Sequence, residues 1–105
     1  MILGVDIVML YRKSMGPKIE FDSKHKKFFV SMNGKEAVLE FVEVGSDTLN
    51  FTHTYVPGEF RGQGMAAKLV EVGLKYARDQ GKKVIASCSY VKSYLDTHAE
   101  FNELR

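Results

Sequence analysis

Alternating apolar and polar residues in the first half of the chain predict four β-strands. The strand pattern covers residues 18–32, with a turn or bulge at 22–24, and then residues 35–44 and 49–56. Asn33-Gly34 predicts a tight hairpin because both residues tolerate a positive φ, and residues 45–47 predict the next turn. We therefore expect an antiparallel meander.

The same alternation predicts which side chains face the core. The inward set is Ile19, Phe21, Phe28 and Val30, followed by Ala37, Leu39, Phe41 and Glu43. Strict alternation over residues 49–56 also puts His53 on the same face as Phe51 and Tyr55.

The second half of the chain changes to a helical period. One apolar face is predicted from Ala66, Leu69, Val70, Gly73, Leu74 and Ala77. Gly81 is a typical residue to follow a helix, residues 83–88 predict a short buried strand, and Val91, Tyr94, Leu95, His98 and Phe101 predict a last amphipathic helix. The order β-β-β-β-α-β-α predicts an α+β fold with a mixed sheet, in which the last strand follows its helix by a right-handed crossover.

Composition narrows the classes of function. The chain has 105 residues and a net charge of +2, so one domain is expected and nucleic-acid binding has no electrostatic support. The basic run at residues 24–27 is interpreted as a solvated turn or edge. Cys88 is the single cysteine, which excludes an internal disulfide, and His25, His53 and His98 show no metal-ligand spacing with it.

Residues 1–16 are expected to be an extension or leader before a domain at 17–105. The apolar run at residues 2–11 contains Asp6 and is far shorter than the roughly 20 residues that span a bilayer. No positive region or cleavage site typical of a signal peptide is found, so we expect a cytoplasmic protein without membrane attachment. An edge strand, a vector-derived leader and sequence upstream of a start at Met15 are all compatible with this segment.

A glycine-rich turn between the strand at 49–56 and the long helix carries the main functional signal. After Pro57-Gly58, the residues Arg61-Gly62-Gln63-Gly64-Met65-Ala66 lead directly into the helix. Glycine lets backbone approach a ligand closely, and the first helical turn offers free N–H groups, so this arrangement predicts a phosphate site.

Two common nucleotide motifs fit this turn poorly. A Walker-type loop requires Gly-Lys-Ser/Thr, whereas this chain has Gly64-Met65-Ala66. The dinucleotide fingerprint is matched formally by Gly62, Gly64 and Ala67, but residues 57–61 separate the turn from its strand and no acidic residue ends the next strand.

The turn instead resembles the GNAT superfamily of N-acetyltransferases. Arg61-x-x-Gly64-x-Ala66 matches the Q/R-x-x-G-x-G/A loop of that superfamily. The segments 51–54, 56–57 and 60–64, and Ser87-Cys88-Ser89-Tyr90-Val91 with Tyr94-Leu95, resemble its small single-domain YjdJ-like branch, and the resemblance covers residues 16–105.

The resemblance implies that the loop amides hold the pyrophosphate of acetyl-CoA, while the pantetheine arm lies between the strands at 49–56 and 84–88. The cofactor-binding residues implied are Thr54, Tyr55, Val56, Arg61, Gly62, Gln63, Gly64, Met65, Ala66, Ser89 and Tyr94. The chain lacks helices that often follow the first strand in this superfamily. We therefore expect an acceptor site that is open or completed by a partner.

The implied reaction is acetyl transfer to an unknown amine. His53 is the candidate general base, because its reference pKa near 6.5 suits the task. Cys88 is a candidate nucleophile or a group lining the thioester, and Tyr90 or Tyr94 can protonate the leaving thiolate. Each of these residues also has a purely structural interpretation. His53 can be a hydrogen-bonded histidine within a strand, Cys88 a small buried apolar residue, and the two tyrosines packed core residues. A non-catalytic coenzyme A-binding module is the alternative function, and a protein-interaction domain is the third.

Overall fold

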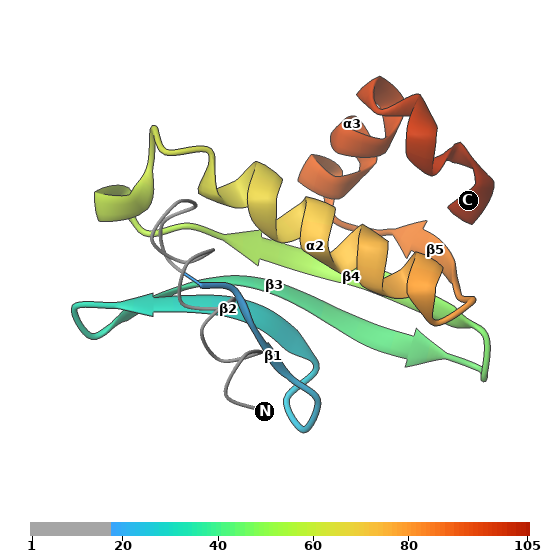
Figure 1. Ribbon diagram of the computed structural model, residues 1–105, viewed down its shortest axis with the longest axis horizontal. Helices are drawn as coiled ribbons and strands as arrows, with labels where there is room; N and C mark the ends of the chain where they lie inside the picture. Colours follow the sequence, from blue (N-terminus) through green and yellow to red (C-terminus); the bar gives the residue numbers. More distant parts are fainter. Residues whose placement is uncertain (1–17) are drawn as a thin grey trace, which may run out of the picture.

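The computed structural model describes residues 18–105 and consists of one mixed β-sheet with helices packed on one of its faces (Figure 1). The strands are β1 (Glu20–Asp22), β2 (Lys27–Met32), β3 (Lys35–Val44), β4 (Thr48–Tyr55) and β5 (Lys83–Ala86). The helices are α2 (Met65–Asp79) and α3 (Ser89–Thr97), with 3₁₀ turns η1 (Gly58–Phe60) and η2 (Ala99–Leu104). Residues 1–16, predicted to be an extension, lie outside the described residues.

The sheet confirms the predicted α+β fold class. Its strands lie in the order β1-β2-β3-β4-β5. The first four pair antiparallel, and β5 pairs parallel to β4 after the crossover through α2. The hairpin between β2 and β3 turns at Asn33 and Gly34, whose φ angles are 52° and 77°, as the left-handed turn requires.

The core lies between the sheet and the two helices. Its largest fully buried side chains are Phe28, Phe51, Phe60, Phe101, Leu39, Leu49, Leu69, Leu74 and Leu95. Gly73 allows α2 to approach the sheet closely: a Cβ atom there would lie 2.7 Å from Leu39 Cδ2 and 3.0 Å from the Phe51 ring. The predicted inward face of the helix is correct from Leu69 to Ala77, whereas Ala66 is only half-buried and Met65 is buried instead. Gly73 sets how close that face comes to the sheet.

A β-bulge in β4 makes one sequence-based expectation wrong. His53 pairs with Glu40 and Phe51 pairs with Phe41, so Thr52 is an extra residue between them. Phe51 is consequently buried on the helix side, whereas Tyr55 is 50% exposed. The three aromatic residues do not share a face, because the extra residue reverses the alternation predicted for the strand.

Two element boundaries also differ from the sequence analysis. The last strand ends at Ala86 rather than Cys88, because the backbone turns there into α3. The last helix ends at Thr97 and is followed by the η2 turn, in which Phe101 is buried as predicted. Within residues 18–105, no helix is long and apolar enough to cross a membrane.

The close approach at Gly73 predicts a specific stability effect. We expect Gly73→Ala to lower the free energy of unfolding by about 1–3 kcal/mol, because the added methyl group must displace Leu39 or Phe51 in a packed core. Urea unfolding measures this change. Gly58→Ala is the matched control, since a Cβ there meets nothing within 4 Å. Equal stability of the two variants would contradict the packing argument.

Candidate functional site

The glycine-rich turn forms the junction between β4 and α2. Gly62 and Gly64 have φ angles of 83° and 68°, which place both in the left-handed region. Gly64 is the residue immediately before α2, and no side chain caps that helix end. The N–H groups of the first helical turn have no intrahelical acceptor. No capping side-chain oxygen accepts from them, so they remain available beside the exposed loop.

Side chains on both sides of the turn hold it in place. Phe60 and Met65 are buried, which anchors the loop at each end. Arg61 Nε donates a hydrogen bond to the Val56 carbonyl oxygen over 3.2 Å, and Gln63 Nε2 donates to the Glu59 carbonyl oxygen over 3.3 Å. The Arg61 side chain therefore already has a structural role in shaping the loop.

A hollow of about 270 Å³ lies beside this turn. Its lining residues are Val56, Phe60, Arg61, Gly62, Gly64, Met65, Ala66, Ala67 and Tyr90. The hollow thus brings together six of the predicted cofactor-binding residues: Val56, Arg61, Gly62, Gly64, Met65 and Ala66. Tyr90 joins them from α3, although the sequence indicated it only as a possible proton donor.

The pairing of the parallel strands β4 and β5 ends before the chain reaches Val56, which lines this hollow. Their last paired residues are Phe51 and Ala86, and the Cys88 N–H then donates to the Phe51 carbonyl oxygen over 3.0 Å. Beyond that bond β4 continues to Tyr55, whereas the chain after β5 turns into α3. We call the edge of β4 at residues 52–55, which β5 leaves unpaired, the strand gap.

Cys88 lies where the strands separate. Its Sγ atom is 3.4 Å from Thr54 Oγ1, and both side chains are partly buried. Burial of the thiol raises its pKa, but hydrogen bonding to the Thr54 hydroxyl and to the backbone of Val91, Tyr90 and Thr54 outweighs burial and leaves the pKa below its ordinary value. A larger fraction of Cys88 is therefore in the thiolate form at a given pH than for an isolated cysteine.

His53 lies on the other side of the sheet from Cys88. The bulge directs Thr54 to the helix side, opposite buried Leu39, and directs exposed His53 to the other face, opposite Glu40. Thr54 rather than His53 is the side chain that contacts the thiol. The catalytic roles of His53 and Cys88 stay predictions, but the structure does not bring the two side chains together.

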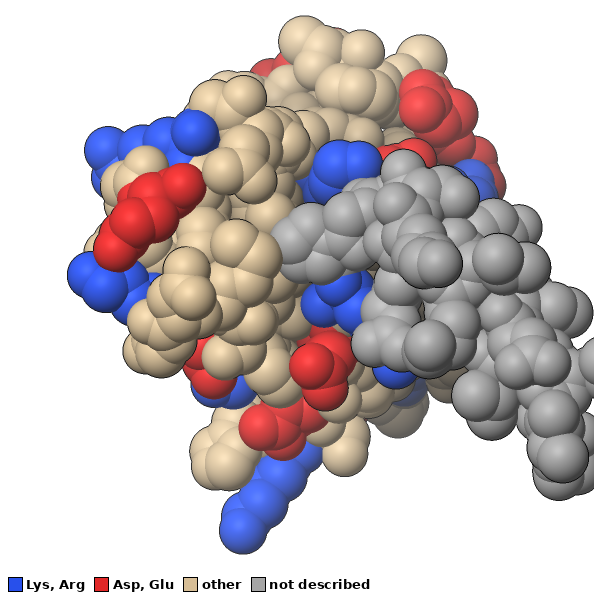
Figure 2. All heavy atoms as spheres, turned by 60° about the vertical axis from the view of Figure 1, so that its left-hand side comes forward, with Lys and Arg blue, Asp and Glu red and all other residues tan. Residues whose placement is uncertain are grey.

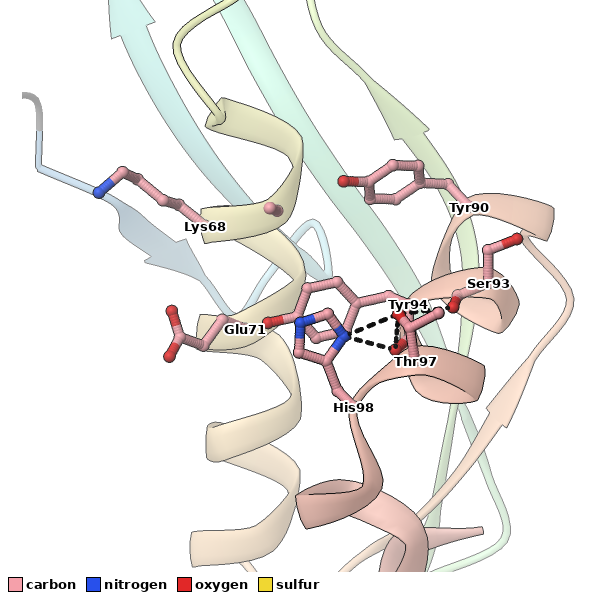
Figure 3. A pocket seen from close by; sticks show the side chains of 8 residues that line it. Lys68, Glu71, Tyr90, Ser93, Tyr94, Thr97 and His98 are labelled. Atoms are coloured by element: carbon pink, nitrogen blue, oxygen red, sulfur yellow. Dashed lines mark hydrogen bonds between the residues drawn. The ribbon is translucent and has the colours of Figure 1, made fainter.

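A second hollow of about 360 Å³ lies between α2 and α3, as Figure 3 shows. It is lined by Ala67, Lys68, Glu71, Tyr90, Ser93, Tyr94, Thr97 and His98. Tyr94, predicted to bind the cofactor, lines this hollow, where burial and then the negative charge of Glu71 raise the pKa of its phenol. No signal in the sequence places Lys68 and His98 at one hollow.

The described part of the surface carries charges of both signs. Basic and acidic side chains are interspersed over the face drawn in Figure 2. Exposed ion pairs such as Lys35 with Glu59, at 3.0 Å, connect β3 to the turn that follows β4. Among residues 18–105, no group of three or more His, Cys, Asp or Glu side chains is arranged to hold a metal ion.

Comparison with known proteins identifies the family. Residues 27–104 match the family described as GCN5-related N-acetyl-transferase. The chain belongs to this family. It is 34% identical to Protein NATD1 of Xenopus tropicalis over 74% of this chain and 73% of that protein. It is 31% identical to Protein NATD1 of Homo sapiens over 74% of this chain and 71% of that protein.

A solved structure supports the same relationship. The NMR solution structure of a protein described as a GCN5-like N-acetyltransferase from Staphylococcus aureus superposes with a TM-score of 0.67 at 29% sequence identity. The match covers 83% of this chain and 85% of that one. The mixed sheet with its helices is therefore the fold of this acetyltransferase family.

The contact between Thr54 and Cys88 predicts a change in thiol reactivity. We expect Thr54→Val to raise the pKa of Cys88, because a hydrogen bond that favours the thiolate is lost. At neutral pH the thiolate fraction should fall, and alkylation by iodoacetamide should slow several-fold. Thr52→Val is the matched control, since the Thr52 hydroxyl donates to the Glu40 carbonyl oxygen. Unchanged pH dependence of alkylation in Thr54→Val would contradict the conclusion that the Thr54 hydroxyl lowers the pKa of Cys88.

Proposed function

We propose that the protein is an acetyl-CoA-dependent N-acetyltransferase that acts on an amine. The observation that supports this proposal is the position of the glycine turn: α2 begins at this turn, and the turn follows the strand gap along the chain. A phosphate site and an open strand edge are thus adjacent, which suits a ligand with a pyrophosphate at one end and an amide-containing arm.

The glycine turn supplies the phosphate end of the proposed site. Gly62 and Gly64 expose backbone N–H groups without a Cβ atom, and the helix dipole of α2 adds partial positive charge there. Gly64 has a φ of 68°, so a β-branched residue would disturb this backbone even though a Cβ would meet nothing within 4 Å. Arg61 contributes one charge, and its Nε–H is already bonded within the loop.

The strand gap supplies the other end. Residues 54–56, at the end of β4 and directly after it, have no partner in β5. Their backbone groups can therefore form hydrogen bonds with the amides of a pantetheine arm. A free backbone N–H in the gap is also the type of donor that stabilises a thioester oxygen as it becomes an oxyanion.

The acceptor amine must lose a proton before or during attack, since an amine with a pKa of about 10.4 is mostly protonated at neutral pH. His53 is the proposed base. Its exposed position on the face away from the helices means that it acts on an acceptor that approaches from that face. Tyr90, which lines the hollow at the glycine turn, is the proposed donor to the leaving thiolate, and Tyr94 lies farther along α3.

Direct transfer is the route that we favour over an acetyl-cysteine intermediate. The thiol of Cys88 has a lowered pKa, but the candidate base lies on the opposite face of the sheet. The free thiol also suits a cytoplasmic location, because a reducing compartment preserves it.

A non-catalytic coenzyme A-binding module is the second candidate function. One observation favours it: His53 and Cys88 do not contact one another, so no assembled base–nucleophile pair lies at the strand gap. Binding without turnover would still use the glycine turn and the gap. Enzymatic assays with a panel of amines distinguish the two functions.

Ligand binding at the turn can be tested by calorimetry and melting. Coenzyme A and acetyl-CoA should stabilise the protein by about 2.7 kcal/mol at 100 times their dissociation constants, whereas NAD should not. Gly64→Val should abolish binding, and Arg61→Ala should only weaken it because the amides remain. Circular dichroism verifies that each variant is folded. Normal binding by folded Gly64→Val would place the phosphates elsewhere.

The route of transfer can be tested with paired variants. If transfer is direct, Cys88→Ala should keep most turnover and His53→Ala should lose more, since only the base is then required. Intact-protein mass spectrometry after incubation with acetyl-CoA checks the alternative. A hydroxylamine-sensitive acetyl adduct on Cys88 that forms as fast as turnover would contradict direct transfer.

A further inference from the structure

The hydrogen-bond ladder between β4 and β5 changes its pattern at its last step. In a parallel pair, every second residue of a strand faces its neighbour and bonds to it through its N–H and its C=O. The Lys83 N–H donates to the Asp47 carbonyl oxygen over 2.8 Å, so Lys83 faces β4. Ile85 and then Ser87 should follow it. A regular ladder would therefore have the Ser87 N–H donate to the Phe51 carbonyl oxygen.

The Ser87 N–H makes a different bond. It donates to the side-chain oxygen Oδ1 of Asn50 over 3.2 Å. The Phe51 carbonyl oxygen accepts instead from the next amide along the chain, the Cys88 N–H, over 3.0 Å. The chain after β5 has thus advanced by one residue relative to β4, as at a β-bulge. The Asn50 side chain holds the N–H group that regular pairing would use.

Asn50 lies on the face of the sheet that points away from the helices. The strand register places it between Val42 of β3 and Ile85 of β5, which are 47% and 45% exposed. Asn50 itself is half-buried. A backbone N–H without an acceptor destabilises a fold about as much as a lost hydrogen bond. With an apolar residue at position 50, the Ser87 N–H would have to return to the acceptor that the ladder offers, the Phe51 carbonyl oxygen.

The advance by one residue also fixes where α3 begins. The Cys88 N–H is bonded to Phe51 of β4, and the Cys88 carbonyl oxygen accepts the first helical bond from the Lys92 N–H over 3.0 Å. The Cys88 thiol is held 3.4 Å from Thr54 Oγ1, and Tyr90 in the first turn of α3 lines the hollow at the glycine turn. A different register would move all of these groups relative to β4.

We propose that Asn50 is a positioning residue of the strand gap: its side-chain oxygen binds the Ser87 N–H and thereby ends the pairing of β4 with β5 at Ala86. Without this bond, β5 would continue along β4 and would cover part of the edge that is now open. Asn50 acts through the backbone of residues 87 and 88 and not on a substrate. Its effect on a ligand rests on the proposed function, because that effect requires a pantetheine arm in the gap.

The first test follows the two amides by hydrogen exchange. Asn50→Leu keeps a similar volume between two apolar neighbours but has no acceptor. We expect the Ser87 N–H to move to the Phe51 carbonyl oxygen, so that the Cys88 N–H loses its acceptor and its protection falls about tenfold or more. Asn50→Asp keeps the side-chain oxygen and should keep both amides protected at neutral pH. Amide exchange measured by NMR gives both values in the folded protein.

Two results would overturn this assignment of the register. In one, Asn50→Leu loses protection at Ser87 while Cys88 stays protected, which means that other contacts hold the register and Asn50 only satisfies one N–H group. In the other, neither amide changes. Asn50→Val is a second variant without an acceptor, and its β-branched side chain suits a strand, so the test does not depend on the folding of one variant.

The second test concerns the ligand. Asn50→Leu should bind coenzyme A about tenfold more weakly than the wild-type protein, as expected for the loss of roughly two hydrogen bonds to the pantetheine arm. It should bind adenosine 3′,5′-diphosphate, which lacks that arm, as the wild type does. Asn50→Asp should bind both ligands like the wild type, and this rescue would not follow from a general loss of stability. Isothermal calorimetry gives each dissociation constant.

The outcomes separate this inference from the proposed function. If the wild-type protein does not bind coenzyme A, the proposed function is wrong, and the exchange of the Ser87 and Cys88 amides still decides whether Asn50 sets the register. If the wild type binds coenzyme A and folded Asn50→Leu binds it equally well, Asn50 does not position the strand gap for a ligand, and only this inference is overturned.

Discussion

The separation of β4 from β5 is the constraint on which the site depends. Backbone N–H and C=O groups of a strand need partners, and β5 provides them only as far as Ala86. Cys88 makes the last backbone bond to β4 and is also the residue from which α3 begins. The same residue therefore ends the pairing and directs the next helix away, which leaves the edge of β4 open beside the glycine turn.

The bulge at Thr52 decides which side chains reach that open edge. Without the extra residue, His53 would face the helices and Thr54 would face away. With it, Thr54 reaches Cys88 at 3.4 Å and His53 is exposed opposite Glu40. The bulge thus places His53 and Cys88, the two candidate catalytic residues, on different faces of the sheet.

Sequence patterns could predict the order of strands and helices, the turn at Gly62 and Gly64, and the buried face of α2, because these follow from local periodicity and glycine conformation. They could not predict the bulge, because Phe51, His53 and Tyr55 fit an unbroken strand equally well and register depends on β3. They also could not predict the hollow between α2 and α3. Lys68 and His98 lie 30 residues apart, and only the packing of α2 against α3 brings them to one space.

The two faces of the sheet have different chemistry, and this difference bears on the acceptor. The helix side holds the glycine turn, the thiol and the hollow between α2 and α3. The other side carries exposed His53 and Tyr55, with Ile85 45% exposed on β5. A ligand in the strand gap would present its thioester to that side only through the opening beside residues 52–55. Under the proposed acetyl transfer, the amine would arrive from the face that carries His53. A small amine needs an enclosed site to be immobilised, so the proposed function would require the acceptor's own surface or a partner to supply binding energy on that face.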